Sequence, residues 1–174
     1  MTLAFLSLGS NIKPEKNMLE AVKLLSCHVK ILKASTVYLT EPLLDKSQPK
    51  YYNCVIEIET DIEPHKLKSE VLRVIEKELG RKRTEDKYAS RTIDIDLILY
   101  GNLIISTKEM IIPDPEIQTR EFLAIPLCEL EPDLFLPDSN KNIKEIADKF
   151  RKPKIAELKS FTKALQGLVR SLSV

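Results

Sequence analysis

Cysteine and histidine are scarce in this 174-residue chain, which contains three cysteines and two histidines. Cys27, Cys54 and Cys128 are an odd number, lie far apart and form no C-x-x-C pair. We therefore expect buried free thiols in a reducing cytoplasm and no disulfide framework. His28 and His65 lie near no cluster of other ligand residues, which argues against a His/Cys zinc site.

An excess of one charge, long apolar runs and the usual phosphate-binding loop are also lacking. The 27 Lys and Arg residues balance the 26 Asp and Glu residues, so a net charge of +1 gives no general reason to expect nucleic acid or an anionic membrane as a partner. The stretch MTLAFLSLGSN has no basic segment, and its apolar run is too short for a signal peptide or a membrane span. No G-x-x-x-x-G-K-[ST] motif is present, which excludes a P-loop enzyme.

What is present is a regular succession of short apolar patterns. Alternation and helical spacing give the order βαββαβ, which predicts an α+β fold, a ferredoxin-like sandwich with helices packed on a mainly antiparallel sheet. Gly101-Asn102 predicts a tight turn into a short partner strand at 103–106. The predicted strands are 2–8, 29–38, 52–60 and the stretch DIDLILYG, and the predicted helices begin at about Pro14 and at 64, the second ending near 79 before Gly80.

The C-terminal third predicts added helices at about 142–150 and 153–171. In the second of these, apolar residues recur at intervals of three and four, but two to three heptads are few for a coiled coil. We therefore expect this helix to dock on the chain's own core. The sequence thus predicts one domain, 1–174, with a core at 1–140, a helical extension at 141–174 and a monomeric state, a homodimer through the last helix being the alternative.

The stretch SRTIDIDLILYG, residues 90–101, places Asp94 and Asp96 two residues apart in a predicted strand, so both carboxylates point to one face. Asp is disfavoured in strands, and two charges about 6.6 Å apart repel by about 2.5 kcal/mol at an effective dielectric near 20. Spacing alone is equally compatible with a solvated strand face. A pair of Mg²⁺ ions would instead turn this repulsion into attraction and bring nucleotide phosphates with them.

A basic loop precedes the two aspartates. In GRKRTEDKYASR, residues 80–91, five cations face two acidic residues, a local net charge of +3. Arginine side chains in such a loop can neutralise the charge on a transferring phosphoryl group. An exposed basic loop without function is the alternative interpretation.

The stretch KYASRTIDIDLILYG resembles the signature of the 6-hydroxymethyl-7,8-dihydropterin pyrophosphokinase family of the folate pathway. The resemblance extends to FLSLGSN, to TEPLL and SQPKYYN in the long loop before 52–60, to ELGRKR and to TREFLAIPLCEL. These segments cover about residues 1–140 in the family's order. The resemblance implies that ATP and the hydroxymethyl dihydropterin give AMP and the pterin diphosphate, with Mg²⁺ as the cofactor and neither nucleic acid nor a membrane as a partner.

The resemblance also implies roles for particular residues. Asp94 and Asp96 are expected to bind two Mg²⁺ ions, and Arg83 and Arg91 to hold the ATP phosphates and stabilise the transition state. Tyr51 and Phe122 are expected to stack on the pterin ring, although both could simply be core or rim aromatics. The other expected contacts are Thr40, Glu41, Leu43 and Asn53 for the pterin, and Glu76, Lys87 and Arg120 for the nucleotide.

The chain departs from the family pattern at three places, the first being Lys87, which often corresponds to an Arg. Tyr88-Ala89-Ser90 stands where many members have Trp-Gly-Pro, and Asp114 replaces a histidine that contacts ATP. An acid at that position is expected to weaken nucleotide binding unless it turns away or meets a cation. Loops 41–50 and 81–90 are expected to close over the substrates.

Two other functions remain open at this point. A nucleotidyltransferase also combines a Gly-Ser turn with D-x-D, but there the two motifs lie close in sequence, whereas Ser10 and Asp94 are far apart. A ferredoxin-like module that binds RNA through the basic loop is the second alternative. The two carboxylates beside that loop would repel phosphate in the absence of metal.

Overall fold

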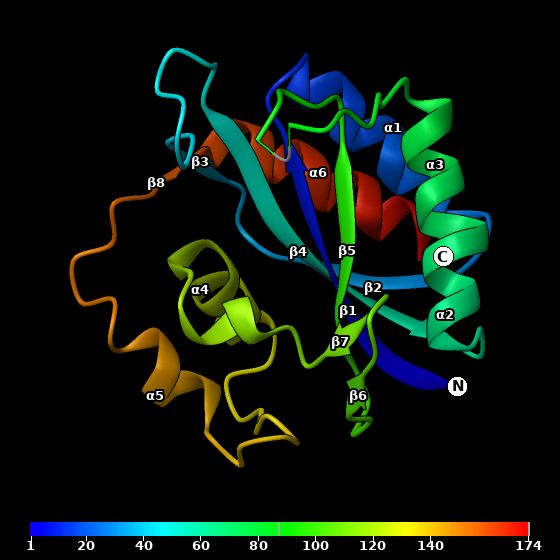
Figure 1. Cartoon of the computed structure of the whole chain (residues 1–174), viewed down its shortest axis with the longest axis vertical. Coiled ribbons are helices and arrows are strands. Elements are labelled where there is room, and N and C mark those ends of the chain that lie inside the picture. The colour runs from blue at the N-terminus through cyan, green and yellow to red at the C-terminus, as the bar shows by residue number, and fades with distance from the viewer. Residues whose placement is uncertain (87, 174) are drawn as a thin grey trace.

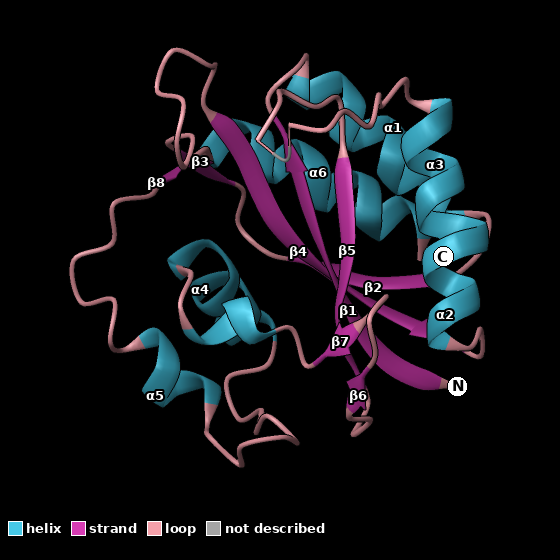
Figure 2. Cartoon of the chain, in the orientation of Figure 1, coloured by secondary structure: helices cyan, strands magenta, loops and turns pink. Residues whose placement is uncertain are grey.

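The computed structural model describes residues 1–86 and 88–173 and has layers of helices on both faces of an antiparallel sheet (Figures 1 and 2). The strands are β1 (Thr2–Ser10), β2 (Lys30–Ala34), β3 (Tyr38–Thr40), β4 (Tyr51–Thr60), β5 (Asp94–Tyr100), β6 (Ile105–Ser106), β7 (Ile111–Ile112) and β8 (Ala156–Glu157). The helices are α1 (Pro14–Ser26), α2 (Pro64–Lys66), the π-helix η1 (Leu67–Leu72), α3 (Arg73–Glu78), the 3₁₀ helix η2 (Pro115–Gln118), α4 (Glu121–Leu130), α5 (Ile143–Ala147) and α6 (Lys159–Leu172).

The sheet is built around β1, which pairs antiparallel with β4 on one side and β5 on the other. The strand order is β5-β1-β4-β3-β8, and β2 pairs with the second half of β4. The predicted strand 29–38 is therefore divided into β2 and β3. The division lies at Ser35, whose N–H donates to the Val55 carbonyl at 2.9 Å while its hydroxyl accepts from the Val55 N–H at 2.9 Å.

One face of the sheet packs against α1, α3 and α6. Leu6, Leu8 and Ile56 are fully buried there together with α1 residues such as Met18. Helix α6 adds to the same core, contributing its buried residues Phe161, Leu165 and Val169. The last helix therefore docks on the chain's own core.

The opposite face packs against α4 and α5 over only part of its length. Phe5 and Val55 lie in this second core, and a register shift between Phe5 and Leu6 directs both Ile98 and Leu99 of β5 into it. Ahead of this bulge, Asp94 and Asp96 alternate with the buried Ile95 and Leu97. The acidic end of β5 thus shares a face with α4 but extends past the apolar part that α4 covers.

The helix predicted at 64–79 is present as the consecutive segments α2, η1 and α3, and Gly80 follows it with φ +80 as a C-terminal glycine should. The partner strand predicted at 103–106 is wrong, because β6 pairs with β7 and not with β5. The free edge of β5 is already occupied: the Ile95 N–H donates to Glu76 Oε1 at 2.8 Å, and the Asp114 N–H donates to the Ile98 carbonyl at 2.9 Å.

The C-terminal helices are shorter than predicted. Helix α5 ends at Ala147, and α6 begins at Lys159 because residues 156 and 157 pair with β3. The three cysteines are free, but the expectation of burial is correct only for Cys54, since Cys27 is exposed and Cys128 is half-buried. Within the described residues, no helix is both long and apolar enough to cross a membrane.

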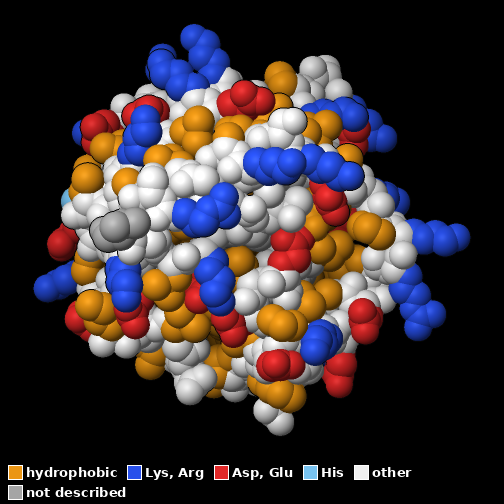
Figure 3. Space-filling view, turned by 180° about the vertical axis from the view of Figure 1, so that it is seen from behind, with side chains coloured by type: hydrophobic (Ala, Val, Ile, Leu, Met, Phe, Trp, Pro, Cys, Tyr) orange, Lys and Arg blue, Asp and Glu red, His pale blue; other side chains and the backbone are white. Residues whose placement is uncertain are grey.

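The surface seen from behind carries charges of both signs. Lys and Arg side chains alternate there with Asp and Glu side chains and with apolar atoms (Figure 3). This face therefore lacks the single large basic patch that a nucleic-acid-binding surface would require.

Candidate active site

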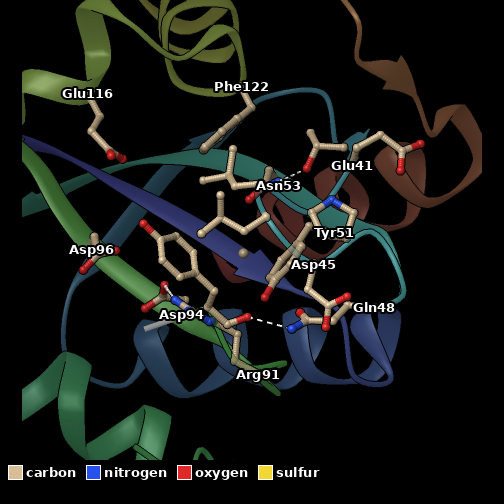
Figure 4. A pocket seen from close by; sticks show the side chains of 16 residues that line it. Glu41, Asp45, Gln48, Tyr51, Asn53, Arg91, Asp94, Asp96, Glu116 and Phe122 are labelled. Atoms are coloured by element: carbon tan, nitrogen blue, oxygen red, sulfur yellow. Dashed lines mark hydrogen bonds and ion pairs between the residues drawn. The ribbon is translucent and has the colours of Figure 1, made fainter. Parts of the chain in front are cut away.

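A cavity of about 220 Å³ lies where β1 ends and β4 and β5 begin, beside the loop 41–50 and the start of α4 (Figure 4). It brings together seven residues that the sequence predicted, namely Thr40, Glu41, Leu43, Tyr51, Asn53, Arg91 and Phe122, as well as both aspartates. It also contains residues that the sequence analysis did not assign, namely Gly9, Pro42, Leu44, Asp45, Gln48, Tyr88 and Glu116.

Gly9 of β1 lies in the floor of the cavity and places no side chain there. Gly9 is paired with Asp94 of β5 on one side and with Asn53 of β4 on the other. A Cβ atom at Gly9 would lie 2.8 Å from Asn53 Oδ1, closer than such contacts allow. The amide of Asn53 is also fixed by its donation to Thr40 Oγ1 at 2.7 Å.

The two aromatic residues that the sequence predicted to stack on a ring enter the cavity from different elements, Tyr51 from β4 and Phe122 from α4 (Figure 4). Among the described residues the ring pair in contact is Tyr52 with Phe161, at 5.7 Å between centroids. Tyr51 and Phe122 both line the cavity and form no such ring pair with each other. A flat heteroaromatic ring with apolar faces is the kind of group that can stack on such side chains.

Asp94 and Asp96 project from the same face of β5 into this cavity, as the sequence predicted (Figure 4). Asp94 forms ion pairs with Arg81 and Arg91. Burial alone would raise the pKa of Asp94, but these two guanidinium groups hold it below its usual value. For Asp96, desolvation followed by the negative charges of Asp94, Glu76 and Asp114 raises the pKa to about 7.

Glu76 lies at the outer edge of β5 and not in the cavity. It is almost completely buried, and besides accepting the Ile95 N–H it pairs with Arg81 and, at 2.8 Å, with Arg83. Burial is the main reason that its pKa is raised. Glu76 thus anchors the basic loop to β5, and Arg81 links it to Asp94. In the sequence, Arg81 is one of the five cations of the basic loop 80–91, and nothing local distinguishes it from the others.

Asn11 connects the two loops that border the cavity. This buried side chain accepts the Arg91 N–H at 2.8 Å and donates to the Pro49 carbonyl and to Ser90 Oγ, both at 3.2 Å. Its backbone N–H also donates to the Arg91 carbonyl at 3.2 Å. The signal was visible in the sequence as GSN, but a short polar turn of this kind is too common to identify such a role.

The remaining predicted nucleotide residues are dispersed. Arg83 is largely exposed beside Glu76, with 60% of its side chain accessible. Arg120 lies in a neighbouring groove between the loop 40–43 and the segment 149–155, and its Nε is buried without a hydrogen-bond partner among the described residues. Lys87 lies outside the described residues.

The carboxylates of Asp94 and Asp96 fit a magnesium site only in combination with other ligands. Within the described part of the chain, no cluster of three or more His, Cys, Asp or Glu residues could hold a metal ion. Mg²⁺ is, however, commonly bound by one or two carboxylates together with substrate phosphates. Asp96 forms no ion pair among the described residues, and together with the adjacent Asp94 it offers the carboxylate oxygens that such a cation would bind.

Known proteins of similar sequence include bacterial pyrophosphokinases. The chain is 38% identical over 161 residues to the 2-amino-4-hydroxy-6-hydroxymethyldihydropteridine pyrophosphokinase of Haemophilus influenzae, a match that covers 91% of this chain and 99% of that protein. The protein of the same name from Aquifex aeolicus is 36% identical over 146 residues, covering 83% and 90%. The folic acid synthesis protein fol1 of Pneumocystis carinii is 38% identical over 147 residues, but the chain spans 20% of its length.

A solved structure of Plasmodium falciparum HPPK-DHPS has the same fold, with a TM-score of 0.67 at 14% sequence identity. That match covers 86% of this chain and 44% of the solved chain. The sequence profile named 7,8-dihydro-6-hydroxymethylpterin-pyrophosphokinase matches residues 5–132. This match and the bacterial relatives together show that the chain belongs to the 7,8-dihydro-6-hydroxymethylpterin-pyrophosphokinase family.

Proposed function

We propose that the cavity over Gly9 is the active site in which this chain performs its family's reaction. That reaction is the transfer of a pyrophosphoryl group from ATP to 6-hydroxymethyl-7,8-dihydropterin, which yields AMP and the pterin diphosphate in folate biosynthesis. The observation that carries the proposal is the position of Asp94 and Asp96, which line the same cavity as Tyr51 and Phe122. The carboxylates that can bind a cation and the aromatic rings that can bind a heteroaromatic group thus line the same cavity.

The pterin is assigned to the part of the cavity that Tyr51 and Phe122 line. Stacking of its flat ring on both sides would bury apolar surface, while Asn53 offers a fixed amide at the polar edge. Gly9 lets the ring lie close to the strand, because no side chain rises from the floor. The hydroxymethyl group then points toward the aspartates.

The nucleotide is assigned to the other side of Asp96. A hollow of about 300 Å³ adjoins this residue and is bordered by η1, β5 and the β6–β7 hairpin. Asp96 faces both the cavity and the hollow. The phosphates of ATP, held beside Asp96, would therefore lie between the rest of the nucleotide and the pterin. This arrangement supports direct transfer, without a covalent enzyme intermediate.

Asp94 and Asp96 would hold the magnesium, for which we propose two ions. When bound, these ions supply positive charge to the phosphate oxygens of ATP. Arg91 lines the cavity, and Arg83 pairs with Glu76 at the edge of β5. Both are proposed to bind phosphate oxygens and stabilise the charge that spreads over the transferring group. The chain itself therefore contributes positioning and electrostatic stabilisation.

We also propose the finer structural and cellular assignments. The order β5-β1-β4 with β2 and β3 beyond, joined by helices on one face, supports the ferredoxin-like classification. The shared core of α6, α1 and β1 supports one domain over residues 1–174 and a monomer. Free thiols support a reducing cytoplasm as the location.

The decisive experiment is incubation of the purified chain with ATP, Mg²⁺ and the hydroxymethyl dihydropterin. We expect AMP and the pterin diphosphate in equal amounts, and no product when EDTA is present. Release of inorganic pyrophosphate would indicate nucleotidyl transfer instead. RNA binding without AMP formation would favour the binding-module alternative.

Loop closure is tested by amide hydrogen exchange. We expect slower exchange in residues 41–50 and 81–86 when the pterin and a non-hydrolysable ATP analogue are added together, because both loops contact the cavity or its aspartates. Unchanged exchange in both loops would rule out closure.

A further inference from the structure

The hollow beside Asp96 contains an unusual combination of charges. It is bordered by two lysines and three acidic residues, the full lining being Lys68, Asp96, Leu97, Lys108, Glu109, Met110, Ile111, Asp114 and Pro115. Lys108 is exposed on the hairpin, whereas Lys68 is half-buried. Lys68 is therefore the cation whose position the protein itself determines.

Lys68 is held in place by a backbone carbonyl. It lies in the first turn of the π-helix η1, and its Nζ donates to the Glu109 carbonyl at 2.7 Å. π-Helical segments are rare and frequently mark functional sites. An ammonium group has three donors, so this bond leaves two of the Lys68 protons for other acceptors.

Asp114 is the charge that Lys68 opposes. The Asp114 side chain begins η2, with Oδ1 accepting the Glu116 N–H at 2.8 Å. Burial raises the pKa of Asp114, and the charge of Lys68 acts in the opposite direction. Within the described residues, no cation lies within ion-pair distance of Asp114, so its charge remains available to repel a phosphate.

We propose that Lys68 is a nucleotide-binding residue of this chain, whose ammonium group offsets Asp114 and donates to an oxygen of ATP. This inference rests on the proposed function, because it takes the hollow as the nucleotide site. A triphosphate entering beside Asp96 and Asp114 meets two carboxylates. Lys68, directed into the hollow by η1 and by the Glu109 carbonyl, supplies the compensating charge and two free donors.

The test is Lys68→Met, with nucleotide binding measured directly. The probe is an ATP analogue with a methylene group between the α and β phosphorus atoms, titrated with Mg²⁺ by calorimetry in the absence of pterin. We expect binding about tenfold weaker, as for loss of a charge-assisted hydrogen bond. In turnover, KM for ATP should rise similarly while KM for the pterin changes less than about twofold.

Two variants separate this role from a structural one. Lys77→Met removes an exposed lysine from the following helix, α3, and is expected to change nothing. Lys68→Arg keeps the charge and is expected to restore most of the nucleotide affinity. If Lys68→Met weakened pterin and nucleotide binding equally, Lys68 would serve only to hold the β6–β7 hairpin, and the proposal would be wrong.

A double-mutant cycle with Asp114→Asn tests the charge compensation. We expect Asp114→Asn alone to tighten analogue binding, and Lys68→Met to cost less in that background. An equal cost in both backgrounds, or unchanged analogue binding in Lys68→Met, would overturn the proposal. Failure of the proposed function is distinguishable, because the wild-type chain itself would then form no AMP.

Discussion

Asp96 has surroundings unlike those of an ordinary surface carboxylate. Desolvation and then the charges of Asp94, Glu76 and Asp114 raise its pKa, and among the described residues no cation forms an ion pair with it. Asp94, by contrast, is paired with Arg81 and Arg91. The pKa values of the two neighbouring carboxylates are thus shifted in opposite directions, and Asp96 is the one whose charge an added cation would stabilise most.

Replacing Asp96 by alanine should abolish catalysis and leave folding intact. We expect AMP formation to fall by at least about a thousandfold, since a ligand of the proposed magnesium site is lost. The free energy of unfolding should be unchanged or higher, because a repulsive charge is removed. Asp94→Ala should lose nearly as much activity.

The control is Asp133→Ala, which removes an exposed carboxylate whose partner is the surface residue Lys144 and should retain full activity. AMP formation at the wild-type rate in Asp96→Ala, measured by chromatography of the nucleotides, would contradict the assigned role.

Glu57 makes stability depend on pH. Oε2 of this buried residue of β4 forms an ion pair with Lys33 Nζ at 3.1 Å, but it makes no hydrogen bond among the described residues. Lys33 Nζ also pairs with Glu131 Oε1 at 2.7 Å, so Glu57 shares this cation. Burial is the largest cause that raises the pKa of Glu57. The folded protein therefore holds this proton more tightly than the unfolded chain does, and stability decreases as the pH rises from the unfolded pKa through the folded one.

Glu57→Gln should remove this dependence. We expect the variant to gain stability relative to wild type between pH 4.5 and 7.5 in urea denaturation, with the difference largest at the higher pH. Glu59→Gln, at the exposed pair with Lys30, is the matched control and should show little change. A difference independent of pH would show that Glu57 is not desolvated as the structure indicates.

At the level of elements, the end of β1 determines how the two loops meet. β1 places Gly9 in the floor and Asn11 directly after the strand, where its amide contacts residues of both loops. The loops are thus joined through one side chain that itself does not line the cavity. Such a residue acts on catalysis through the loops it orders.

Asn11→Ala should therefore loosen both loops at once. We expect amide exchange to increase in 45–49 and 88–91, and kcat/KM to fall by about ten- to a hundredfold. The free energy of unfolding should fall by about 1–3 kcal/mol, because the half-buried Ser90 and Arg91 lose their hydrogen bonds to Asn11. Asn102→Ala in an exposed turn is the control. Faster exchange in only one loop would show that Asn11 does not couple them.

For the molecule as a whole, α6 belongs to the core that supports the active-site sheet. Leu165 is fully buried against this core, while Leu172 on the same helix is partly exposed. Helix α6 contacts both β2 and α1, and β2 in turn pairs with β4, which carries Tyr51 and Asn53. The C-terminal extension thus stabilises the site without contributing residues to it.

Leu165→Ala should destabilise the protein by about 2–5 kcal/mol, the usual cost of a cavity at a buried leucine. Leu172→Ala should cost less than about 0.5 kcal/mol. Sedimentation should give a monomer for the wild type and both variants. A dimer whose dissociation accompanied the Leu165→Ala change would instead place α6 in an interface.

The sequence by itself determined the element types, the shared face of Asp94 and Asp96 and, through its resemblance, the family. Strand alternation has a period of two, so the relation between those carboxylates is local. Contacts across distant segments were decided only by the tertiary structure. The pairing of β6 with β7, the division at Ser35 and the junctions made by Asn11, Glu76 and Lys68 all join residues that no local pattern relates. They depend on which edges and donors remain available after the sheet forms, and that is a property of the folded chain.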